Sequence, residues 1–106
     1  MEQRKHPRYQ FECEIWFPEK VGSVAATVSN LSVEGCKVDS KASAYIGMYL
    51  ALQICLPGQE ATLKIDQAAV RWAKKKKYGL EFMSMWPEEE ERLHHLVSSL
   101  ETHTSH

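Results

Sequence analysis

Apolar and polar residues alternate in short runs through most of the chain, from Phe11 to Phe82. In the first run, residues 11–17, every second residue is apolar, and Glu12 and Glu14 stand between apolar neighbours. A period of two is typical of a β-strand with one buried face. Similar runs, separated by turn residues, predict strands at residues 24–28, 36–38, 50–56, 61–72 and 78–82. About six short strands in this arrangement favour an antiparallel barrel over a parallel sheet.

The longest of these runs, residues 61–72, changes phase near its middle. Its apolar residues hold one phase at Leu63 and Ile65 and the opposite phase at Ala68, Val70 and Trp72. A slip of one residue moves every following side chain to the other face of a strand. We therefore expect a β-bulge, or a bend at a barrel corner, near Asp66 and Gln67.

Residues 87–101 are predicted to form a C-terminal helix. Pro87 suits the first position of a helix, and the glutamates at 88–90 complement the positive end of the helix dipole. The apolar residues that follow have the spacing of a helix that lies on a core, namely Leu93, Leu96, Val97 and Leu100. The expected organisation is an arm at residues 1–10, a mainly β, six-stranded antiparallel barrel with its helix at residues 11–101, and a frayed tail at residues 102–106.

Composition places the chain among folded soluble domains and limits its partners. Its 106 residues fit one domain, 43% of them are hydrophobic and 25% are charged, and the net charge is −1. This charge argues against bulk adhesion to nucleic acid or to an anionic membrane. No apolar run is long enough to cross a bilayer, and the N-terminus lacks the apolar core of a signal peptide. We therefore expect a cytoplasmic protein without membrane insertion.

The sequence offers little for catalysis or for metal binding. Cys13, Cys36 and Cys55 are widely spaced and lie in strand-like runs, which predicts small apolar fillers rather than disulfides or zinc ligands. Most of the histidines follow residue 93, and no serine or cysteine stands in the context of an activated nucleophile. We expect no enzyme, no catalytic residue, no metal and no cofactor.

Two short motifs suggest a binding site for an anionic ligand. Arg4 and Arg8 lie four positions apart in the predicted arm, and an arginine fork can hold a phosphate or the edge of a guanine. Asn30, Ser32 and Gly35 lie in the turn between the second and third predicted strands, where short polar side chains and a glycine shape a backbone. Taken separately, each motif has a simpler explanation, because terminal arginines are usually solvated and such a turn is often only a turn.

The order of the two motifs resembles that of the PilZ domain family. Arg4 and Arg8 match the family's Arg-x-x-x-Arg motif, and Asn30, Ser32 and Gly35 match its (Asp/Asn)-x-Ser-x-x-Gly motif. Residues 70–72 and 78–82 look like the family's last two strands, so the resemblance covers about residues 3–101. Gln3 stands where many members of the family carry another basic residue.

The resemblance implies a bacterial receptor for cyclic di-GMP on a six-stranded PilZ-type barrel. By analogy, Arg4 and Arg8 would contact guanines and phosphates, Asn30 and Ser32 would hydrogen-bond the ligand, and Gly35 would keep the turn open. Binding would order the arm and change the contacts with a separate effector protein, in a pathway such as motility or biofilm formation that the sequence does not name. Whether one ligand or a stacked pair binds stays open, as does assembly into a homodimer.

Two other functions remain open at this stage. A PilZ-like adaptor would act through protein contacts without binding nucleotide, although the complete motifs argue against it. A small barrel for single-stranded nucleic acid would interleave aromatic and basic residues, which only Arg71-Trp72 and Lys77-Tyr78 do, so no nucleic-acid partner is expected.

Charge runs and large aromatic residues are ambiguous. The lysines at 74–77 are interpreted as a solvated turn, with attraction of an acidic partner surface or of the anionic ligand as the alternative. For most of Trp16, Trp72 and Trp86 we expect a packing role in the barrel or against the helix, with exposed contacts to a partner as the alternative.

Overall fold

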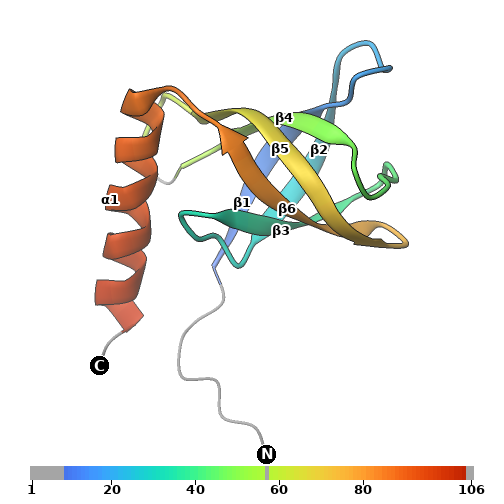
Figure 1. Cartoon of the computed structure of the whole chain (residues 1–106). Helices are drawn as coiled ribbons and strands as arrows, with labels where there is room; N and C mark the ends of the chain where they lie inside the picture. Colours follow the sequence, from blue (N-terminus) through green and yellow to red (C-terminus); the bar gives the residue numbers. More distant parts are fainter. Residues whose placement is uncertain (1–8, 57, 105–106) are drawn as a thin grey trace, which may run out of the picture.

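Six antiparallel strands form the body of the molecule in a computed structural model that describes residues 9–56 and 58–104, with side chains as far as Leu100. The strands are β1 (Gln10–Trp16), β2 (Ser23–Ser29), β3 (Gly35–Ser40), β4 (Tyr49–Ile54), β5 (Leu63–Lys74) and β6 (Lys77–Ser84). They close into a barrel in the order β1-β2-β3-β6-β5-β4 (Figure 1). The predicted six-stranded barrel is therefore confirmed.

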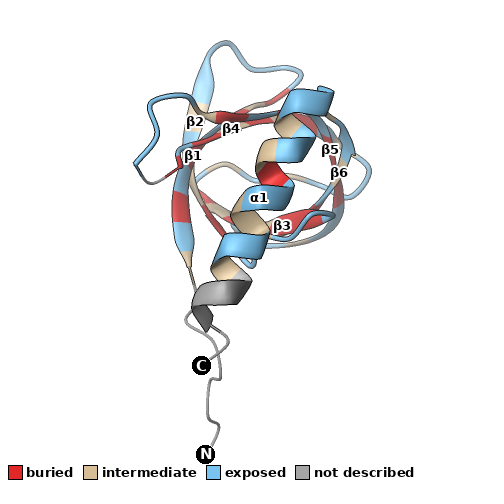
Figure 2. Cartoon of the chain, turned by 90° about the vertical axis from the view of Figure 1, so that its left-hand side faces the viewer, coloured by how far each residue is buried: buried red, intermediate tan, exposed pale blue. Residues whose placement is uncertain are grey.

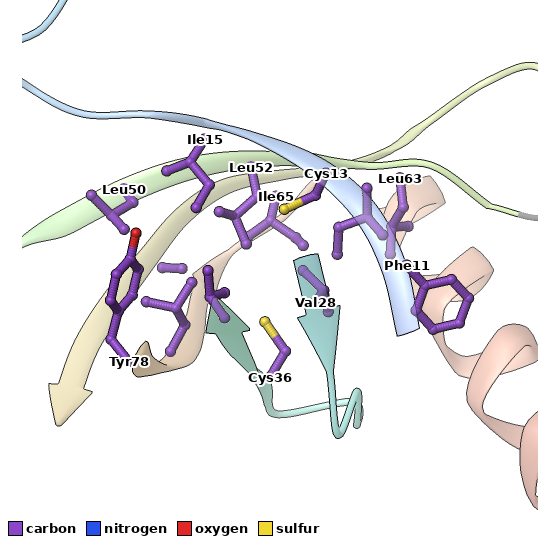
Figure 3. Close-up of a cluster of buried hydrophobic side chains, with 14 of the residues drawn as sticks. Phe11, Cys13, Ile15, Val28, Cys36, Leu50, Leu52, Leu63, Ile65 and Tyr78 are labelled. Atoms are coloured by element: carbon purple, nitrogen blue, oxygen red, sulfur yellow. The ribbon is translucent and has the colours of Figure 1, made fainter. Parts of the chain in front are cut away.

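The alternating pattern places one face of each strand inside the barrel. In β1 the side chains of Phe11, Cys13 and Ile15 are buried, whereas Glu12 and Glu14 are exposed. Figure 3 shows the buried residues of the different strands meeting in one apolar core, with Tyr78 among them. Burial of this shared apolar surface is the main stabilising contribution to a barrel of this size.

The expected phase change in β5 is present. Ile65 and Ala68 are both buried, and the pairing of β5 with β6 shifts by one residue between Gln67 and Ala68. A bulge at this position keeps both halves of the long strand facing the core.

A second shift in β5 corrects the prediction for Trp72. The sequence pattern assigns Trp72 to the same face as Val70, yet the register shifts again between these two residues. Val70 pairs with Leu80 inside the barrel, whereas Trp72 pairs with Gly79 and is 42% exposed. Trp72 therefore lies on the outer wall of the barrel.

The helix α1 (Pro87–Thr104) crosses one end of the barrel (Figure 2). It begins at Pro87 as predicted but continues past the expected end at residue 101, since no glycine or proline stops it. Leu93, only 1% exposed, faces the core.

A network of polar contacts around Arg92 attaches α1 to the segment before β5. The Arg92 guanidinium donates to the carbonyl oxygens of Ala61 and Thr62 at 2.9 and 2.8 Å, and to Gln59 Oε1 at 2.9 Å. Glu89 Oε1 accepts from Arg92 at 3.1 Å and from the Lys64 amide at 3.0 Å. Among the described residues, no helix is both long enough and apolar enough to span a membrane.

Candidate functional site

The two halves of the predicted site differ in what the structure describes. Arg4 and Arg8 lie outside the described residues, so the role of the arm stays a prediction. Asn30, Ser32 and Gly35 all lie in or next to the turn that joins β2 to β3. The barrel half of the site can therefore be built residue by residue.

Ser32 holds this turn together. Its Oγ accepts hydrogen bonds from the amides of Glu34 and Gly35, at 3.1 and 3.2 Å, and donates one to the Gly35 carbonyl at 3.3 Å. The Ser32 amide also donates to the Gly35 carbonyl, at 2.9 Å. The main effect of this hydroxyl is thus to fix the backbone, as short polar side chains do in turns.

Asn30 enters the turn with a left-handed backbone, at a φ of 52°. Asparagine tolerates this conformation better than most residues, which explains its place here. Its side chain is exposed beside Ser32. An amide in this position presents both a donor and an acceptor to the surface.

Gly35 allows a close approach between two strands. A Cβ at this position would overlap the backbone carbonyl of Leu80 in β6. The neighbouring Glu34 carbonyl accepts a hydrogen bond from the Phe82 amide at 2.8 Å, which ties the turn to β6. The φ of Gly35 is not positive, so a glycine is not needed here for a special turn conformation. It is needed because a larger residue would prevent the close contact between β3 and β6.

The turn forms one side of an open hollow on the outer wall of the barrel. The hollow has a volume of about 380 Å³, and its lining includes Asn30, Ser32 and Gly35 together with Lys37, Trp72 and Glu81. The structure therefore brings the three predicted barrel residues together and adds side chains from β3, β5 and β6.

Trp72 provides an aromatic surface in this hollow. Gly79 lies between Lys37 of β3 and Trp72 of β5 in the strand register. A Cβ on Gly79 would overlap the indole ring of Trp72, so the ring lies against the bare backbone at this position. An indole held in this way offers a flat face on which a base can stack.

Charge in the hollow is mixed but partly compensated. Two carboxylates line it: Glu81 pairs with Arg71 at 2.5 Å, whereas Glu34 forms no ion pair with the residues that the structure describes. In the part of the chain that the structure describes, no carboxylate forms an ion pair with the half-buried Lys37. The Lys37 ammonium is therefore available to an anionic group that enters the hollow.

Sequence reasoning did not include Lys37 or Trp72 in the site. Lys37 was an ordinary polar position within a short strand, and Trp72 was expected to pack. Gly79 is the sequence feature that could have indicated the position of the Trp72 ring. A glycine inside a strand often marks a place where another group approaches the backbone closely.

Two larger hollows are lined by none of the three motif residues that the structure describes. One, of about 600 Å³, crosses the outer face of β1, β2 and β3 and is lined in part by Glu12, Thr27 and Lys41. The other, of about 460 Å³, lies between Tyr9 and α1. We assign the candidate site to the smaller hollow because it gathers the three motif residues with a lysine and an aromatic ring.

The thiols of the barrel interior are not nucleophiles. Burial raises the pKa of Cys13 to about 12, with smaller contributions from Cys55 and Glu14. Burial also raises the pKa of Cys36. Neither residue is a thiolate at neutral pH, and the described residues contain no group of side chains suited to a metal ion.

A closed barrel with a lateral hollow, lined by a polar turn, a lysine and an aromatic ring, defines the class of a small binding module. The family model of the PilZ domain matches residues 2–99, and the chain therefore belongs to the PilZ domain family. PilZ domains are regulatory and are generally receptors for cyclic di-GMP. No curated protein matches the chain.

Two solved structures share the fold at low sequence identity. The PilZ domain of CeSA from a cellulose-synthesizing bacterium has a TM-score of 0.66 and 18% identity, and the match covers 90% of this chain and 98% of that one. The Bacillus subtilis inhibitor of motility, MotI/DgrA, has a TM-score of 0.64 and 22% identity, and the match covers 97% of this chain and 53% of that one.

Proposed function

We propose that the protein is a receptor for cyclic di-GMP, with a binding site divided between the N-terminal arm and the barrel wall. The observation that carries the proposal is that Asn30, Ser32 and Gly35 meet Lys37 and Trp72 in one open hollow. Membership of the PilZ family supports this ligand. In MotI/DgrA the same fold occurs in a protein named as an inhibitor of motility, which is consistent with signalling.

Each part of the site suits one part of the ligand. The Trp72 ring offers a stacking surface for a guanine, and base–aromatic stacking contributes about 1–3 kcal/mol per base. Lys37 attracts a phosphate, and the Asn30 amide can pair with a base edge. Arg4 and Arg8 add guanidinium forks that bind phosphates and the O6 and N7 atoms of guanine.

Ser32 and Gly35 have a supporting role in this proposal. The Ser32 hydroxyl already bonds to the backbone of the turn, so its contribution to binding is to keep Asn30 in position. Gly35 holds the turn against β6. Preorganisation of this kind lowers the cost of binding.

Calorimetric titration with cyclic di-GMP, the linear dinucleotide and a short oligonucleotide tests the proposal. We expect saturable heat with the cyclic ligand alone, and loss of this heat in Arg8→Ala. Lys64→Ala is the control. It also removes one positive charge, but from an exposed position at the start of β5, next to α1. Absence of heat with every ligand would favour a nucleotide-free adaptor, and a response to the oligonucleotide would favour a nucleic-acid-binding barrel.

Signal output in this proposal comes from the arm and a separate effector protein. The arginines stand outside the barrel in sequence, so a ligand held by both halves must order the arm against the hollow. Hydrogen exchange over residues 1–10, with and without cyclic di-GMP, measures this step. Unchanged exchange at saturation would contradict arm ordering while leaving the binding intact.

A further inference from the structure

Three turns gather at the end of the barrel opposite α1. They are residues 17–22 between β1 and β2, residues 41–48 between β3 and β4, and the tip of the β5–β6 hairpin at residues 74–77. Trp16 pairs with Ala51, and the Ser40 amide donates to the Lys76 carbonyl at 3.0 Å, which places the three turns side by side. Figure 1 shows all three turns at the right, on the side away from the helix.

Two of these turns expose apolar side chains. Val21 is fully exposed, Tyr45 is 61% exposed and Ile46 is 67% exposed. None of the three belongs to the described core or packs against it. They are therefore apolar side chains that are left in contact with solvent at this end of the barrel.

Lysines lie in the same three turns. Those that are exposed are Lys20, Lys41, Lys74, Lys75, Lys76 and Lys77. Nearby carboxylates are Glu19 and Asp39, together with Glu12 and Glu14, which line the same hollow as Lys41 and Lys76. Asp39 pairs with Lys77 at 3.5 Å. The opposite end of the molecule carries the exposed glutamates 88, 90 and 91 at the start of α1. The net charge of −1 thus conceals a positive end and a negative end.

We propose that the end formed by residues 17–22, 41–48 and 74–77 docks peripherally on an anionic lipid bilayer. A bilayer surface is planar and deformable, so apolar side chains from separate turns can enter it independently. Lysines near an anionic leaflet are each attracted by about 1 kcal/mol. Lysines together with exposed aliphatic and aromatic side chains are the combination that interfacial membrane-binding segments carry.

The proposed docking end is separate from the nucleotide site. The hollow with Asn30, Lys37 and Trp72 opens on the lateral wall of β3, β6 and β5. It is lined neither by Val21, Tyr45 or Ile46 nor by the lysines at 74–76. A bilayer and a nucleotide therefore bind through different residues. Bilayer binding does not depend on the proposed nucleotide function.

Sedimentation with vesicles of equal parts phosphatidylglycerol and phosphatidylcholine tests the docking end. We expect wild type to sediment with these vesicles at low salt and to stay in solution with pure phosphatidylcholine. Replacement of Lys74, Lys75 and Lys76 by glutamine should weaken partitioning about a hundredfold, since each lysine contributes about fivefold. Ile46→Asp should also weaken it, because a carboxylate opposes entry into the interface.

Matched variants at the other end of the molecule control for general effects. Lys64→Gln removes a lysine near the helix, and Trp86→Asp changes an apolar side chain that is 63% exposed there. Both should sediment like wild type, and circular dichroism should show that no variant unfolds at a lower temperature than wild type. Trp86→Asp is expected to unfold at a slightly higher temperature, because position 86 caps α1 and aspartate is a favoured capping residue. Equal sedimentation of wild type and the triple lysine variant would overturn the proposal. Binding to polyglutamate without binding to anionic vesicles would overturn it as well and would assign this end to an acidic protein.

Discussion

The indole ring of Trp72 lies against the backbone of Gly79, and only a glycine at position 79 leaves room for it. Because Gly79 also pairs with Lys37, the ring and a cation lie on β5 and β3, the two strands that flank β6 in the outer wall. The turn that starts at Asn30 borders the same surface. The contact between Trp72 and Gly79 therefore positions the indole ring in the lining of the candidate site.

Trp72→Ala should weaken binding of cyclic di-GMP by about 1–3 kcal/mol, the usual cost of losing one base–aromatic stack. The ring is outside the core, so the unfolding temperature should change little. Calorimetry measures the affinity, and quenching of tryptophan fluorescence on titration reports contact with the ring. Trp86→Ala is the control, because Trp86 is exposed at the start of α1 and away from the hollow. Equal affinities of wild type and Trp72→Ala would exclude stacking on this ring.

Sequence patterns predicted the fold because burial of one strand face imposes a period of two. They also predicted the bulge near Gln67, since Ile65 and Ala68 both had to face the core. The outward position of Trp72 was not predictable in this way, because the second shift arises from pairing with β6. The meeting of Lys37 and Trp72 likewise depends on strand order, which a local pattern does not contain.

Ser32→Ala should loosen the turn between β2 and β3. The change removes the acceptor for the amides of Glu34 and Gly35, and a typical hydrogen bond contributes about 0.5–1.5 kcal/mol. Water can partly replace the hydroxyl at this exposed turn, so affinity for cyclic di-GMP should fall more than stability does. Calorimetry and urea unfolding measure the two effects.

Ser32→Thr is the matched variant for this test because it keeps the hydroxyl. It should retain most of the affinity that Ser32→Ala loses. If both variants bound cyclic di-GMP as wild type does, the turn would have no part in recognition.

Arg92→Ala should remove the polar contacts that attach α1 to the segment before β5. The guanidinium bonds to the carbonyl oxygens of Ala61 and Thr62 and also to Gln59 and Glu89. Loss of this partly buried set should reduce the free energy of unfolding by about 2–3 kcal/mol. Arg92→Lys should restore little, since a single ammonium cannot span these acceptors. Urea unfolding measures the loss, and His94→Ala on the exposed side of α1 should be neutral.

The rates at which the three cysteines react with a thiol reagent should distinguish the buried thiols from the exposed one. Cys13 and Cys36 are buried as expected of apolar fillers, whereas Cys55 is exposed just after the end of β4, so that expectation is wrong for Cys55. A disulfide reagent at pH 8 should therefore modify Cys55 quickly in the folded protein, and all three thiols after denaturation. Rapid reaction of Cys13 or Cys36 in the folded protein would contradict the burial that raises their pKa values.

The same burial predicts a loss of stability at alkaline pH. In the unfolded chain a thiol ionises near pH 9.0, whereas the pKa of Cys13 in the fold is about 12. The stability gained by keeping this thiol neutral is complete below pH 9.0 and is lost as the pH rises toward 12, because only the unfolded state readily forms the thiolate. Urea unfolding of wild type and Cys13→Ala between pH 8 and 11 measures the effect. The variant should lose less stability over this range, and parallel curves would show that Cys13 ionises equally in both states.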